Sequence, residues 1–485
     1  MKSHVTDYAL YRWRYKIGYS LIFLIVVVIL GLTSIYIPGS LREAELSSAL
    51  ESGALSAQSL DPATVVNLPY HILQRLGFMM FGVSTLTIKL PSIILGTLTS
   101  VGICLLTRAW FRRNVAVLAT VLAVTTTQFL FLIQDGTPAI LFTFVTIWLL
   151  TAGTYVTRSA IFNTFWKVIG CVLMATALYV PLGVYVVIAL LITASFHPHI
   201  RYIIRKISRP RLILALILGL ASIAPLVYAS IVNPSVALTL LGVPTASFDI
   251  VANLKTVALD LFGFFSTSTS ALLRPTYSLG VVILMAVGIY KFFTVKYTAR
   301  SYVVLILATF MLPLIILNPK YLSSLYPLST LMIAMGMATM IASWYKLFPR
   351  NPYARVAGLL PLSVFVVGLI FSGMMRYMNN YSYNPQVLDH YSSDLALLDQ
   401  YLAKNKTDAE STRLVASKDQ LAFYSLVAHY DKRFSVSVDI TDTPKTVLLT
   451  HDSRHIRVPN LELSHIVTSH KIRNADRFYV YTTKQ

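Results

Sequence analysis

The segment between residues 38 and 89 gathers carboxylates in a chain that otherwise has few of them. It holds Glu43, Glu45, Glu51 and Asp61, whereas the whole chain of 485 residues has only 20 Asp and Glu. A carboxylate held near a substrate can take a proton during a reaction, which is the work of a general base. Residues 38–89 are therefore a candidate catalytic loop, with Glu43 and Glu45 as its first candidates.

The composition identifies an integral membrane protein. Hydrophobic residues make up 56% of the chain and charged residues 12%, whereas soluble domains have about 25% charged residues. Apolar runs long enough to cross roughly 30 Å of hydrocarbon as helices recur through the first three quarters of the chain, while a closed barrel would show short alternating strands. We predict an all-α polytopic fold of about 11 membrane-spanning helices. They lie at 17–37, 88–108, 114–133, 137–157, 167–196 (two helices), 211–232, 277–294, 301–317, 323–345 and 355–376.

The apolar block at 167–196 is counted as two helices because basic residues flank it on both sides. Lys and Arg mark cytoplasmic loops, so both ends of the block are predicted to lie on the cytoplasmic side. Proline interrupts the hydrogen-bond ladder of a helix, and glycine tolerates a turn. We therefore predict two short helices that meet at Tyr179, Pro181 and Gly183.

The distribution of charge predicts the orientation of the chain. Basic residues cluster before the first span and in alternate loops. This pattern predicts that the N-terminus lies in the cytoplasm and that the C-terminal domain lies outside a plasma membrane. The N-terminal segment is predicted to be a retained signal anchor. The net charge of +20 fits loops that face anionic membrane lipids and requires no nucleic-acid partner. After Asp7, every acidic residue before position 388 is predicted to lie outside: Glu43, Glu45, Glu51, Asp61, Asp135, Asp249 and Asp260.

The composition changes at about residue 377, beyond which polar residues are frequent and no spanning run follows. The stretch 386–404 has apolar residues at helical spacing. Five short runs are predicted to be strands, namely 413–417, 433–439, 445–450, 465–470 and 477–483. The chain is therefore predicted to have a transmembrane domain at 1–376 and a small extracytoplasmic α/β domain at 377–485.

An ordered series of motifs begins after Asn67. The series consists of Leu68-Pro69-Tyr70, Phe81-Gly82-Val83, Ile88-Lys89-Leu90-Pro91-Ser92 and Arg112-Arg113. Further along the chain come Gly136-Thr137-Pro138, Asn318-Pro319-Lys320-Tyr321 and Tyr326-Pro327. In this order they resemble motifs of the lipid-linked-sugar glycosyltransferases of the GT-C fold, in the branch that contains bacterial aminoarabinose transferases and protein O-mannosyltransferases.

The resemblance implies an inverting glycosyltransferase that takes a sugar from a polyprenyl-phosphate donor and attaches it to a lipid, protein or glycan acceptor at the outer face. Such a transfer needs a carboxylate to accept the proton of the acceptor hydroxyl and cations to hold the leaving phosphate. The candidate catalytic residues are Glu43, Glu45 and Asp135, and the candidate lipid-phosphate ligands are Lys320, Tyr321, Arg75 and Arg274.

Three positions depart from the pattern of the family. The family has an Asp-Glu pair in the region of Glu43 and Glu45, and if Glu43 is aligned to its Glu, Arg42 occupies the place of the Asp. Asn67 replaces a Lys, which removes one phosphate contact, and Ala139 replaces an Asp that follows Gly-x-Pro. Asp135, four residues before Ala139, is the candidate to take over the role of that Asp.

The candidate residues also have structural interpretations. Glu43 and Glu45 suit the solvated face of a short interfacial helix. Asp135 suits the first turn of a helix, where negative charge is favourable. Lys320 can extend from a helix end to the membrane surface, and Arg75 can belong to the polar stripe of an interfacial helix.

No cofactor is predicted. A divalent metal stays open as a cofactor, but the sequence does not support one, because it has no clear cluster of metal ligands. His197 and His199 flank Pro198 on the predicted inner side, and Cys104 and Cys171 lie inside predicted spans.

Two other functions stay open. A transporter or flippase of envelope lipids would also have many spans. It would be expected to place ionisable residues within the bundle and to show repeated halves, and we find neither feature in the sequence. A catalytically inactive relative, whose outer domain binds envelope polymer, would explain the missing Asp and Lys.

Overall fold

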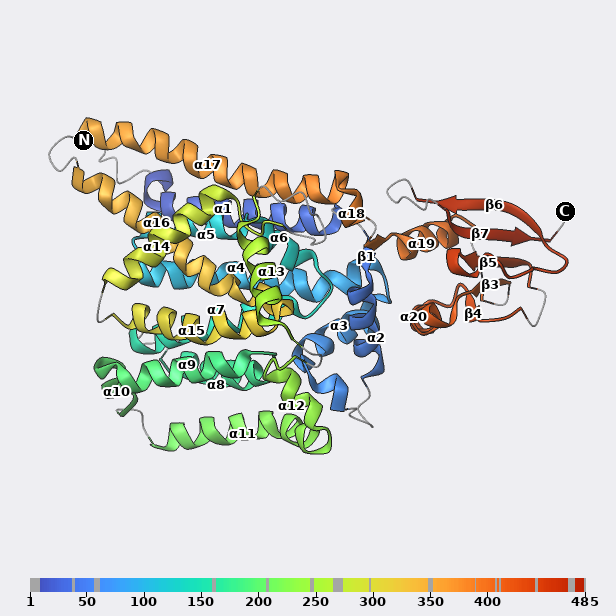
Figure 1. Ribbon diagram of the computed structural model, residues 1–485, viewed down its shortest axis with the longest axis horizontal. Helices are drawn as coiled ribbons and strands as arrows, with labels where there is room; N and C mark the ends of the chain where they lie inside the picture. The colour runs from blue at the N-terminus through green and yellow to red at the C-terminus, as the bar shows by residue number, and fades with distance from the viewer. Residues whose placement is uncertain are drawn as a thin grey trace.

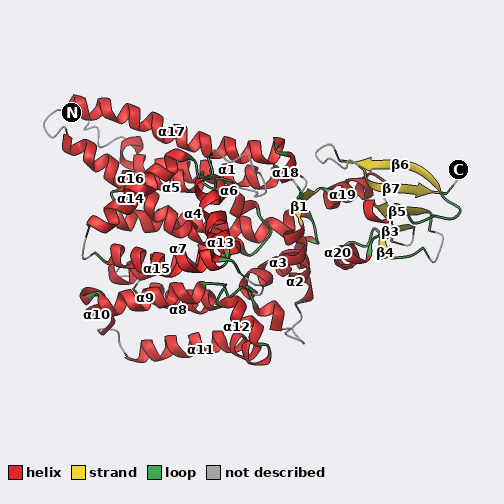
Figure 2. Cartoon of the chain, in the orientation of Figure 1, coloured by secondary structure: helices red, strands yellow, loops and turns green. Residues whose placement is uncertain are grey.

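The computed structural model describes residues 9–36, 40–55, 62–158, 163–205, 209–244, 248–264, 274–295, 298–347, 352–388, 390–405, 408–409, 411–440, 444–469 and 476–483. These residues form a bundle of helices and, at one end of it, a smaller domain with a β-sheet (Figure 1, Figure 2). We call the end that carries residues 41–82 the domain end of the bundle. The opposite end, which carries residues 158 and 198–205, is the distal end.

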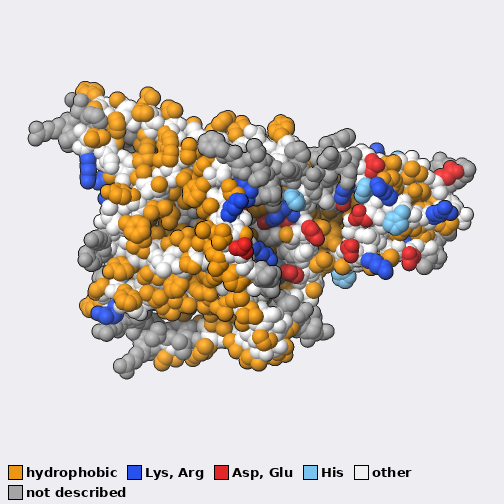
Figure 3. Space-filling model, viewed as in Figure 1, with side chains coloured by type: hydrophobic (Ala, Val, Ile, Leu, Met, Phe, Trp, Pro, Cys, Tyr) orange, Lys and Arg blue, Asp and Glu red, His pale blue; other side chains and the backbone are white. Residues whose placement is uncertain are grey.

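Apolar runs account for the helices of the bundle, because a helix satisfies its own backbone hydrogen bonds where no water is available. The helices are α1 (Ala9–Tyr36), α4 (Thr85–Trp110), α5 (Arg113–Val124), α6 (Thr127–Gln134), α7 (Ala139–Arg158), α8 (Asn163–Leu178), α9 (Gly183–Phe196), α10 (Pro198–Arg205), α11 (Arg209–Val232), α12 (Pro234–Leu240), α13 (Ile250–Phe262), α14 (Leu279–Thr294), α15 (Ala299–Leu317), α16 (Tyr326–Leu347) and α17 (Pro352–Tyr383). Hydrophobic side chains cover the bundle on the face shown in Figure 3, as expected for contact with lipid.

Six helices of the described residues are long and apolar enough to cross a membrane. Two further pairs pass the same test together but are bent, α5 with α6 by 62° and α11 with α12 by 119°, and α8, α9 and α14 are shorter apolar helices. Each predicted span corresponds to one of these helices or pairs, so the multi-pass helical fold is confirmed. The number of spans and their orientation remain predictions.

The apolar block at 167–196 forms two helices, as predicted. α8 ends at Leu178 and α9 begins at Gly183. Leu182 has a φ of 65°, and a Cβ on Gly183 would lie 1.9 Å from the carbonyl oxygen of Ala177. Glycine is therefore required where the chain turns back.

Two short helices of the first loop, α2 (Glu43–Ala54) and α3 (Leu68–Phe81), lie at the domain end, with the 3-10 turn η2 (Pro62–Val65) before α3. α3 exposes Leu73, Leu76 and Met80. Exposed apolar residues at this spacing form one face, which is typical of a helix that lies in the membrane surface.

The C-terminal domain has a five-stranded sheet in the order β4-β3-β5-β7-β6. β3 is parallel to β4 and β5, whereas β7 is antiparallel to β5 and β6. The elements are α18 (Pro385–Leu388), β2 (Tyr391–Ser392), α19 (Asp394–Asn405), β3 (Thr412–Val415), α20 (Lys418–Tyr430), β4 (Ser435–Ser437), β5 (Thr446–Thr450), η4 (His451–Ser453), β6 (Glu462–Thr468) and β7 (Asp476–Thr482). The mixed helix and sheet content of the domain is confirmed.

The helices of this domain differ in detail from the prediction. The helix predicted at 386–404 is divided into α18 and α19, because β2 lies between them. α20 was not predicted, although its buried residues Phe423, Tyr424 and Val427 recur at helical spacing. All five predicted strands have a counterpart in the sheet.

The domain joins the first loop through a small sheet and a shared hydrophobic core. β1 (Leu41–Arg42) pairs with β2 in an antiparallel ladder. One buried cluster includes Ala49 of α2, Phe78 of α3 and Phe423 of α20. The first loop is therefore held between the bundle and the domain. The predicted domain boundary at 376/377 falls inside α17 and remains a prediction.

Candidate active site

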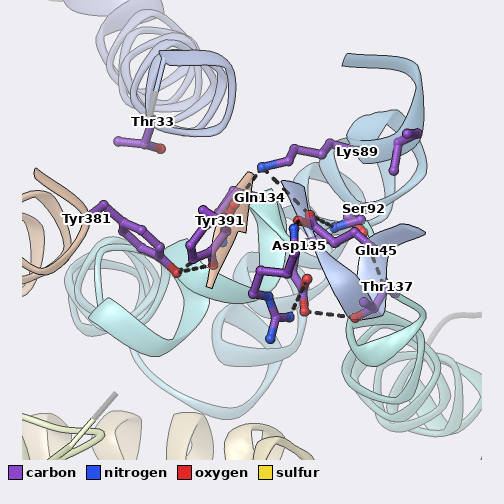
Figure 4. Close-up of polar contacts among 12 residues, drawn as sticks. Thr33, Glu45, Lys89, Ser92, Gln134, Asp135, Thr137, Tyr381 and Tyr391 are labelled. Atoms are coloured by element: carbon purple, nitrogen blue, oxygen red, sulfur yellow. Dashed lines mark hydrogen bonds and ion pairs between the residues drawn. The ribbon is translucent and has the colours of Figure 1, made fainter. Parts of the chain in front are cut away.

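Four charged side chains meet in the interior at the domain end: Arg42, Glu45, Lys89 and Asp135. Figure 4 shows Glu45, Lys89 and Asp135 close together. The four side chains come from β1, α2, α4 and the turn after α6. The Lys89 and Asp135 side chains are 2% and 3% exposed, and Glu45 is fully buried. Buried charges persist only when they are paired and hydrogen-bonded, so the partners of each one define the site.

Glu45 connects the first loop to the turn before α7. Its Oε2 accepts a hydrogen bond from the backbone N–H of Arg42 at 2.6 Å, and its Oε1 accepts one from Gly136 at 2.6 Å. Lys89 Nζ lies 3.7 Å from the same Oε1. Burial raises the pKa of Glu45, and this effect exceeds the opposing influence of Lys89. Both carboxylate oxygens are therefore engaged in holding the backbone.

Asp135 forms an ion pair with Arg42. Its Oδ1 accepts a hydrogen bond from Arg42 Nη2 at 2.6 Å, and its Oδ2 accepts one from the Thr137 hydroxyl at 2.8 Å. The guanidinium also lies 5.1 Å from the centre of the Phe131 ring. Within the described residues, Arg42 Nε is buried and has no hydrogen-bond partner. One N–H donor of Arg42 is therefore unused.

Lys89 was not among the predicted site residues. It donates to Gln134 Oε1 at 3.1 Å, and Gln134 donates in turn to the Tyr381 hydroxyl at 3.1 Å. The Tyr391 hydroxyl donates to Tyr381 at 3.1 Å, so the network reaches the C-terminal domain. A lysine in the opening turns of a predicted span is costly in hydrocarbon and usually has a partner, and that signal could have identified it.

A neutral network lies beside the charged one. His71 Nδ1 lies 2.8 Å from the Ser52 hydroxyl, which donates to Gln74 Oε1 at 2.5 Å. Gln74 donates to the carbonyl of Ile88 at 2.7 Å. Burial lowers the pKa of His71 to about 4, so its ring is neutral at pH 7. Its Nε2 lies 3.3 Å from Glu51 Oε2.

Two of the predicted phosphate ligands interact with the second half of α2. Lys320 is exposed in η3 (Pro319–Leu325). Partial burial raises the pKa of Glu51, and the charge of Lys320 opposes that rise, so Lys320 acts electrostatically on Glu51. Arg75 Nη1 donates to the carbonyl of Gly53 at 3.4 Å. Lys320 and Arg75 therefore both interact with residues in the second half of α2.

The other two predicted phosphate ligands contact other parts of the chain. Arg274 donates to Asp260 Oδ1 from Nη2 at 2.7 Å and from Nε at 2.9 Å. Tyr321 is half-buried, and a Cβ on Gly242 would lie 3.7 Å from its ring. The charge of Arg274 is thus already balanced by a carboxylate.

A cleft of about 870 Å³ lies between the start of α2 and the C-terminal domain, and we call it the domain cleft. Glu43 is exposed and lines this cleft beside Arg42. It is the one predicted catalytic carboxylate that is open to solvent, since Glu45 and Asp135 are buried. The charged residues that line the cleft are Arg42, Glu43, Asp394, Asp419, Asp452 and Arg477.

The part of the cleft that the C-terminal domain forms is polar, and within the described residues one of its buried hydrogen-bonding groups has no partner. Asp394 accepts a hydrogen bond from Arg477 Nη2 at 2.7 Å, so this pair is internally balanced. Gln420 donates to Asp452 at 2.7 Å, but in the described part of the chain its Oε1 is buried without a partner. The hydroxyl groups of Ser47, Ser392 and Ser417 complete the polar lining. Such a surface can bind a ligand with many hydroxyl groups.

In the described ranges, no group of three or more His, Cys, Asp or Glu side chains is placed to hold a metal ion. Cys104 and Cys171 are separate free thiols in α4 and α8. His197 lies in the other half of the molecule, at the distal end after α9. The described residues therefore define no metal site.

The sequence of residues 69–228 matches the family model of dolichyl-phosphate-mannose-protein mannosyltransferases. This match begins in α3, covers α4 to α10 and ends in α11. It includes Lys89 and Asp135 of the charged cluster. A comparison with curated protein sequences finds no match.

The fold is similar to solved structures over nearly its whole length. The crystal structure of ArnT from Cupriavidus metallidurans bound to undecaprenyl phosphate has a TM-score of 0.55 and 13% identity, and the similarity covers 96% of this chain and 98% of that one. The Archaeoglobus fulgidus oligosaccharyltransferase tethered to an acceptor peptide has a TM-score of 0.50 and 14% identity, over 88% of this chain and 64% of that one. The fold is therefore that of GT-C glycosyltransferases, and the resemblance inferred from the motifs is confirmed.

Proposed function

We propose that this chain is an inverting membrane glycosyltransferase that takes a sugar from a polyprenyl-phosphate donor and attaches it to an acceptor hydroxyl at the domain end. The GT-C fold and the family model matched by residues 69–228 support this reaction class. One observation carries the assignment to a site: Glu43 and Arg42 line the same cleft. A base and a cation are the two groups that the reaction needs.

In the proposed reaction, the Glu43 carboxylate takes the proton of the acceptor hydroxyl. The hydroxyl oxygen attacks the anomeric carbon of the donor on the face opposite the phosphate. The bond between that carbon and the phosphate oxygen breaks, and the polyprenyl phosphate leaves with the bonding electrons. The Arg42 guanidinium, which lines the same cleft and is partly exposed, stabilises the charge that develops on the phosphate.

Asp135 and Glu45 act in this proposal as positioning residues. Asp135 holds the Arg42 guanidinium, and Glu45 binds the backbone amide of Arg42 at the start of α2. Both oxygens of each carboxylate are engaged, and both side chains are buried. Neither is open to an acceptor, whereas Glu43 is exposed.

Lys320 and Arg75 are proposed to receive the donor phosphate before transfer. They interact with Glu51 and Gly53, in the second half of α2. Glu51 follows Glu43 by eight residues, which is roughly 12 Å along a helix. Lys320 and Arg75 therefore act at the opposite end of α2 from Glu43. In this proposal the two cations belong to donor binding rather than to the chemical step.

The acceptor is proposed to carry many hydroxyl groups, as a glycan or a sugar-bearing lipid does. The carboxylates and serine hydroxyls of the domain cleft can exchange hydrogen bonds with neighbouring hydroxyls of a sugar. The cleft is proposed to face the outside of a plasma membrane, with the N-terminus in the cytoplasm. The basic residues of the predicted inner loops support this orientation.

Transfer of radiolabelled sugar by the purified protein in lipid nanodiscs tests the function. Polyprenyl-phosphate sugars serve as donors and envelope extract supplies acceptors. Glu43→Gln is expected to lower the transfer rate by a factor of about 100 or more, which is a typical contribution of a general base, and to leave the unfolding temperature unchanged. Glu462→Gln in the exposed strand β6 is the control for the loss of one carboxylate.

The possible outcomes separate the alternatives. Full activity of Glu43→Gln would remove Glu43 as the base but leave the transferase in place. Absence of transfer with every donor would contradict the enzyme itself. In that case, movement of a labelled lipid across vesicle membranes would indicate a transporter, and binding of envelope polymer would indicate a catalytically inactive relative.

A further inference from the structure

A second cavity lies at the distal end of the bundle. It has a volume of about 630 Å³ and lies between α7, α8, α9, α11 and the first turn of α15. α7 begins four residues after Asp135 and ends at Arg158, which lines the cavity. A helix of this length extends roughly 30 Å, so the cavity is separate from the candidate active site. Its walls are mostly apolar, with Leu149, Leu150, Met174, Leu190, Leu191 and Leu218 among them.

Three cations and no carboxylate line this cavity. Arg158, Lys167 and Arg300 are among its lining residues, which include no Asp or Glu. None of the three has an ion pair with a carboxylate of the described chain. Arg158 and Arg300 donate to the carbonyls of Ala109 and Trp110 at the end of α4, and their like charges act on each other. A group of positive charges without acidic partners favours an anion.

The cavity has the depth of one membrane leaflet. Along α7 its lining extends from Arg158 to Leu149, which is roughly 14 Å and close to half of the roughly 30 Å of hydrocarbon in a bilayer. Val172, Leu191 and Leu218 in its wall are 51%, 57% and 46% exposed, so the cavity is open on the side that faces lipid. A chain that enters sideways from the membrane can therefore reach its deep end.

Aromatic and polar side chains lie among the cations. Trp110 and Trp166 line the cavity, and the Trp110 indole donates to Thr154 Oγ1 at 3.0 Å. Tryptophan is enriched at the level of lipid headgroups. His197 also lines the cavity, and in the described part of the structure its Nδ1 is buried without a hydrogen-bond partner. The cavity thus combines a headgroup-like end with an apolar interior.

We propose that this cavity binds an anionic glycerophospholipid from the leaflet at the distal end. The phosphate of the headgroup contacts Arg158, Lys167 and Arg300, His197 offers a hydrogen bond, and the acyl chains occupy the apolar interior. A free phosphate uses only the cations, whereas a lipid uses the cations and the apolar walls together. Lipid binding here does not depend on the proposed sugar transfer.

Native mass spectrometry of the full-length protein, released from nanodiscs of stated composition, tests this site. One molecule of phosphatidylglycerol per chain is expected to remain bound, while phosphatidylcholine is lost. The double variant Arg158→Ala with Lys167→Ala is expected to bind phosphatidylglycerol about 30-fold more weakly. Arg201→Ala removes a distal-end cation that does not line the cavity and is expected to bind normally.

A second pair of variants leaves every charge in place. Gly153 lines the cavity, and a Cβ added there would meet nothing within 4 Å. Gly153→Phe is therefore expected to fill the cavity and abolish lipid retention, while Gly153→Ala retains it. Normal retention by Gly153→Phe overturns the proposal, and so does equal retention of phosphatidylcholine. Displacement of the lipid by millimolar inorganic phosphate would indicate a bare anion site, and preference for a polyprenyl phosphate would overturn the lipid class.

Discussion

Arg42 Nη2 lies 2.6 Å from Asp135 Oδ1, and this ion pair joins the first loop to the turn after α6. The two residues are 93 positions apart, so their contact depends on the whole fold. The side chain of Asp135 is 3% exposed and that of Arg42 is 17% exposed, so the pair is largely withdrawn from water. Removing one partner of a buried pair leaves a charge without compensation.

Arg42→Ala is therefore expected to lower the free energy of unfolding by about 3–5 kcal/mol, because Asp135 stays buried without its partner. Denaturant unfolding in detergent measures this change. Asp135→Ala and the double variant complete a thermodynamic cycle. The double variant is expected to be more stable than the sum of the single changes predicts, by about 1 kcal/mol or more. Additive effects would contradict a direct interaction.

Glu45→Gln and Glu43→Gln are expected to differ in what they change. In the native fold the backbone N–H groups of Arg42 and Gly136 both donate to the Glu45 carboxylate. In Glu45→Gln an NH2 group replaces one of the two carboxylate oxygens. Its N–H donors would face one of these backbone N–H donors, so that hydrogen bond would be lost. The loss of one such buried bond costs about 1–3 kcal/mol. Stability and transfer rate should therefore fall together in Glu45→Gln, whereas Glu43→Gln should lose transfer alone. A stable Glu45→Gln that lacks transfer would instead assign Glu45 to the chemical step.

Gly136→Ala is expected to destabilise the site. A Cβ at this position would lie 2.8 Å from Ile88 Cγ2 and 3.2 Å from Glu45 Oε1. Crowding of this kind in a packed interior costs about 1–3 kcal/mol. Gly153→Ala is the matched control, because its Cβ would meet nothing within 4 Å. Equal unfolding temperatures for the two variants would show that the turn before α7 can relax around the added methyl group.

The stability of the protein is expected to fall as the pH is lowered, because His71 becomes protonated. Burial lowers the pKa of His71 to about 4, whereas an unfolded histidine has a pKa of about 6.5. Between these values the unfolded chain binds more protons, so this contribution is complete above about pH 6.5 and is lost as the pH falls towards 4. One group with this shift contributes at most about 3 kcal/mol. Glu51, 3.3 Å from Nε2, offsets part of the loss once the ring is protonated.

Unfolding of the wild type and of His71→Gln between pH 7 and pH 5 measures this contribution. The other histidines are common to both proteins and cancel in the comparison. The variant is expected to be less stable at pH 7 and to depend less on pH. Parallel curves would mean that His71 is not the group that titrates.

The spans could be predicted from the sequence because each depends on a local property. A helix that crosses the membrane needs about 20 consecutive apolar residues, and such runs are visible without knowledge of contacts. The turn between α8 and α9 was also local, since Pro181 interrupts a helix and Gly183 has no room for a side chain. α20 was missed because its polar residues masked a short buried face around Phe423.

The candidate site could be predicted only in part. Glu43, Glu45 and Asp135 were identifiable because acidic residues are rare in the chain. Their partners were not, because Arg42 meets Asp135 and Lys89 meets Glu45 only after the first loop, α4 and α6 have packed together. From the sequence alone, Arg42 suggested only that an Asp of the family is missing at this position. The structure shows instead that it neutralises another carboxylate.

Lys320→Ala is expected to raise the KM for the polyprenyl-phosphate donor several-fold and to leave kcat/KM nearly unchanged. Lys320 is exposed and acts electrostatically on Glu51, in the second half of α2, so it can meet the donor phosphate but not the reacting carbon at Glu43. An interaction that is made in the bound state and is absent from the transition state changes KM without changing kcat/KM. Arg42→Lys keeps the charge but loses the planar donor geometry, so it should lower kcat. Lys346→Ala, in the last turn of α16, controls for the loss of a lysine. A fall in kcat for Lys320→Ala without a change in KM would indicate that the phosphate leaves beside Lys320. Glu51 would then be the nearest candidate for the base.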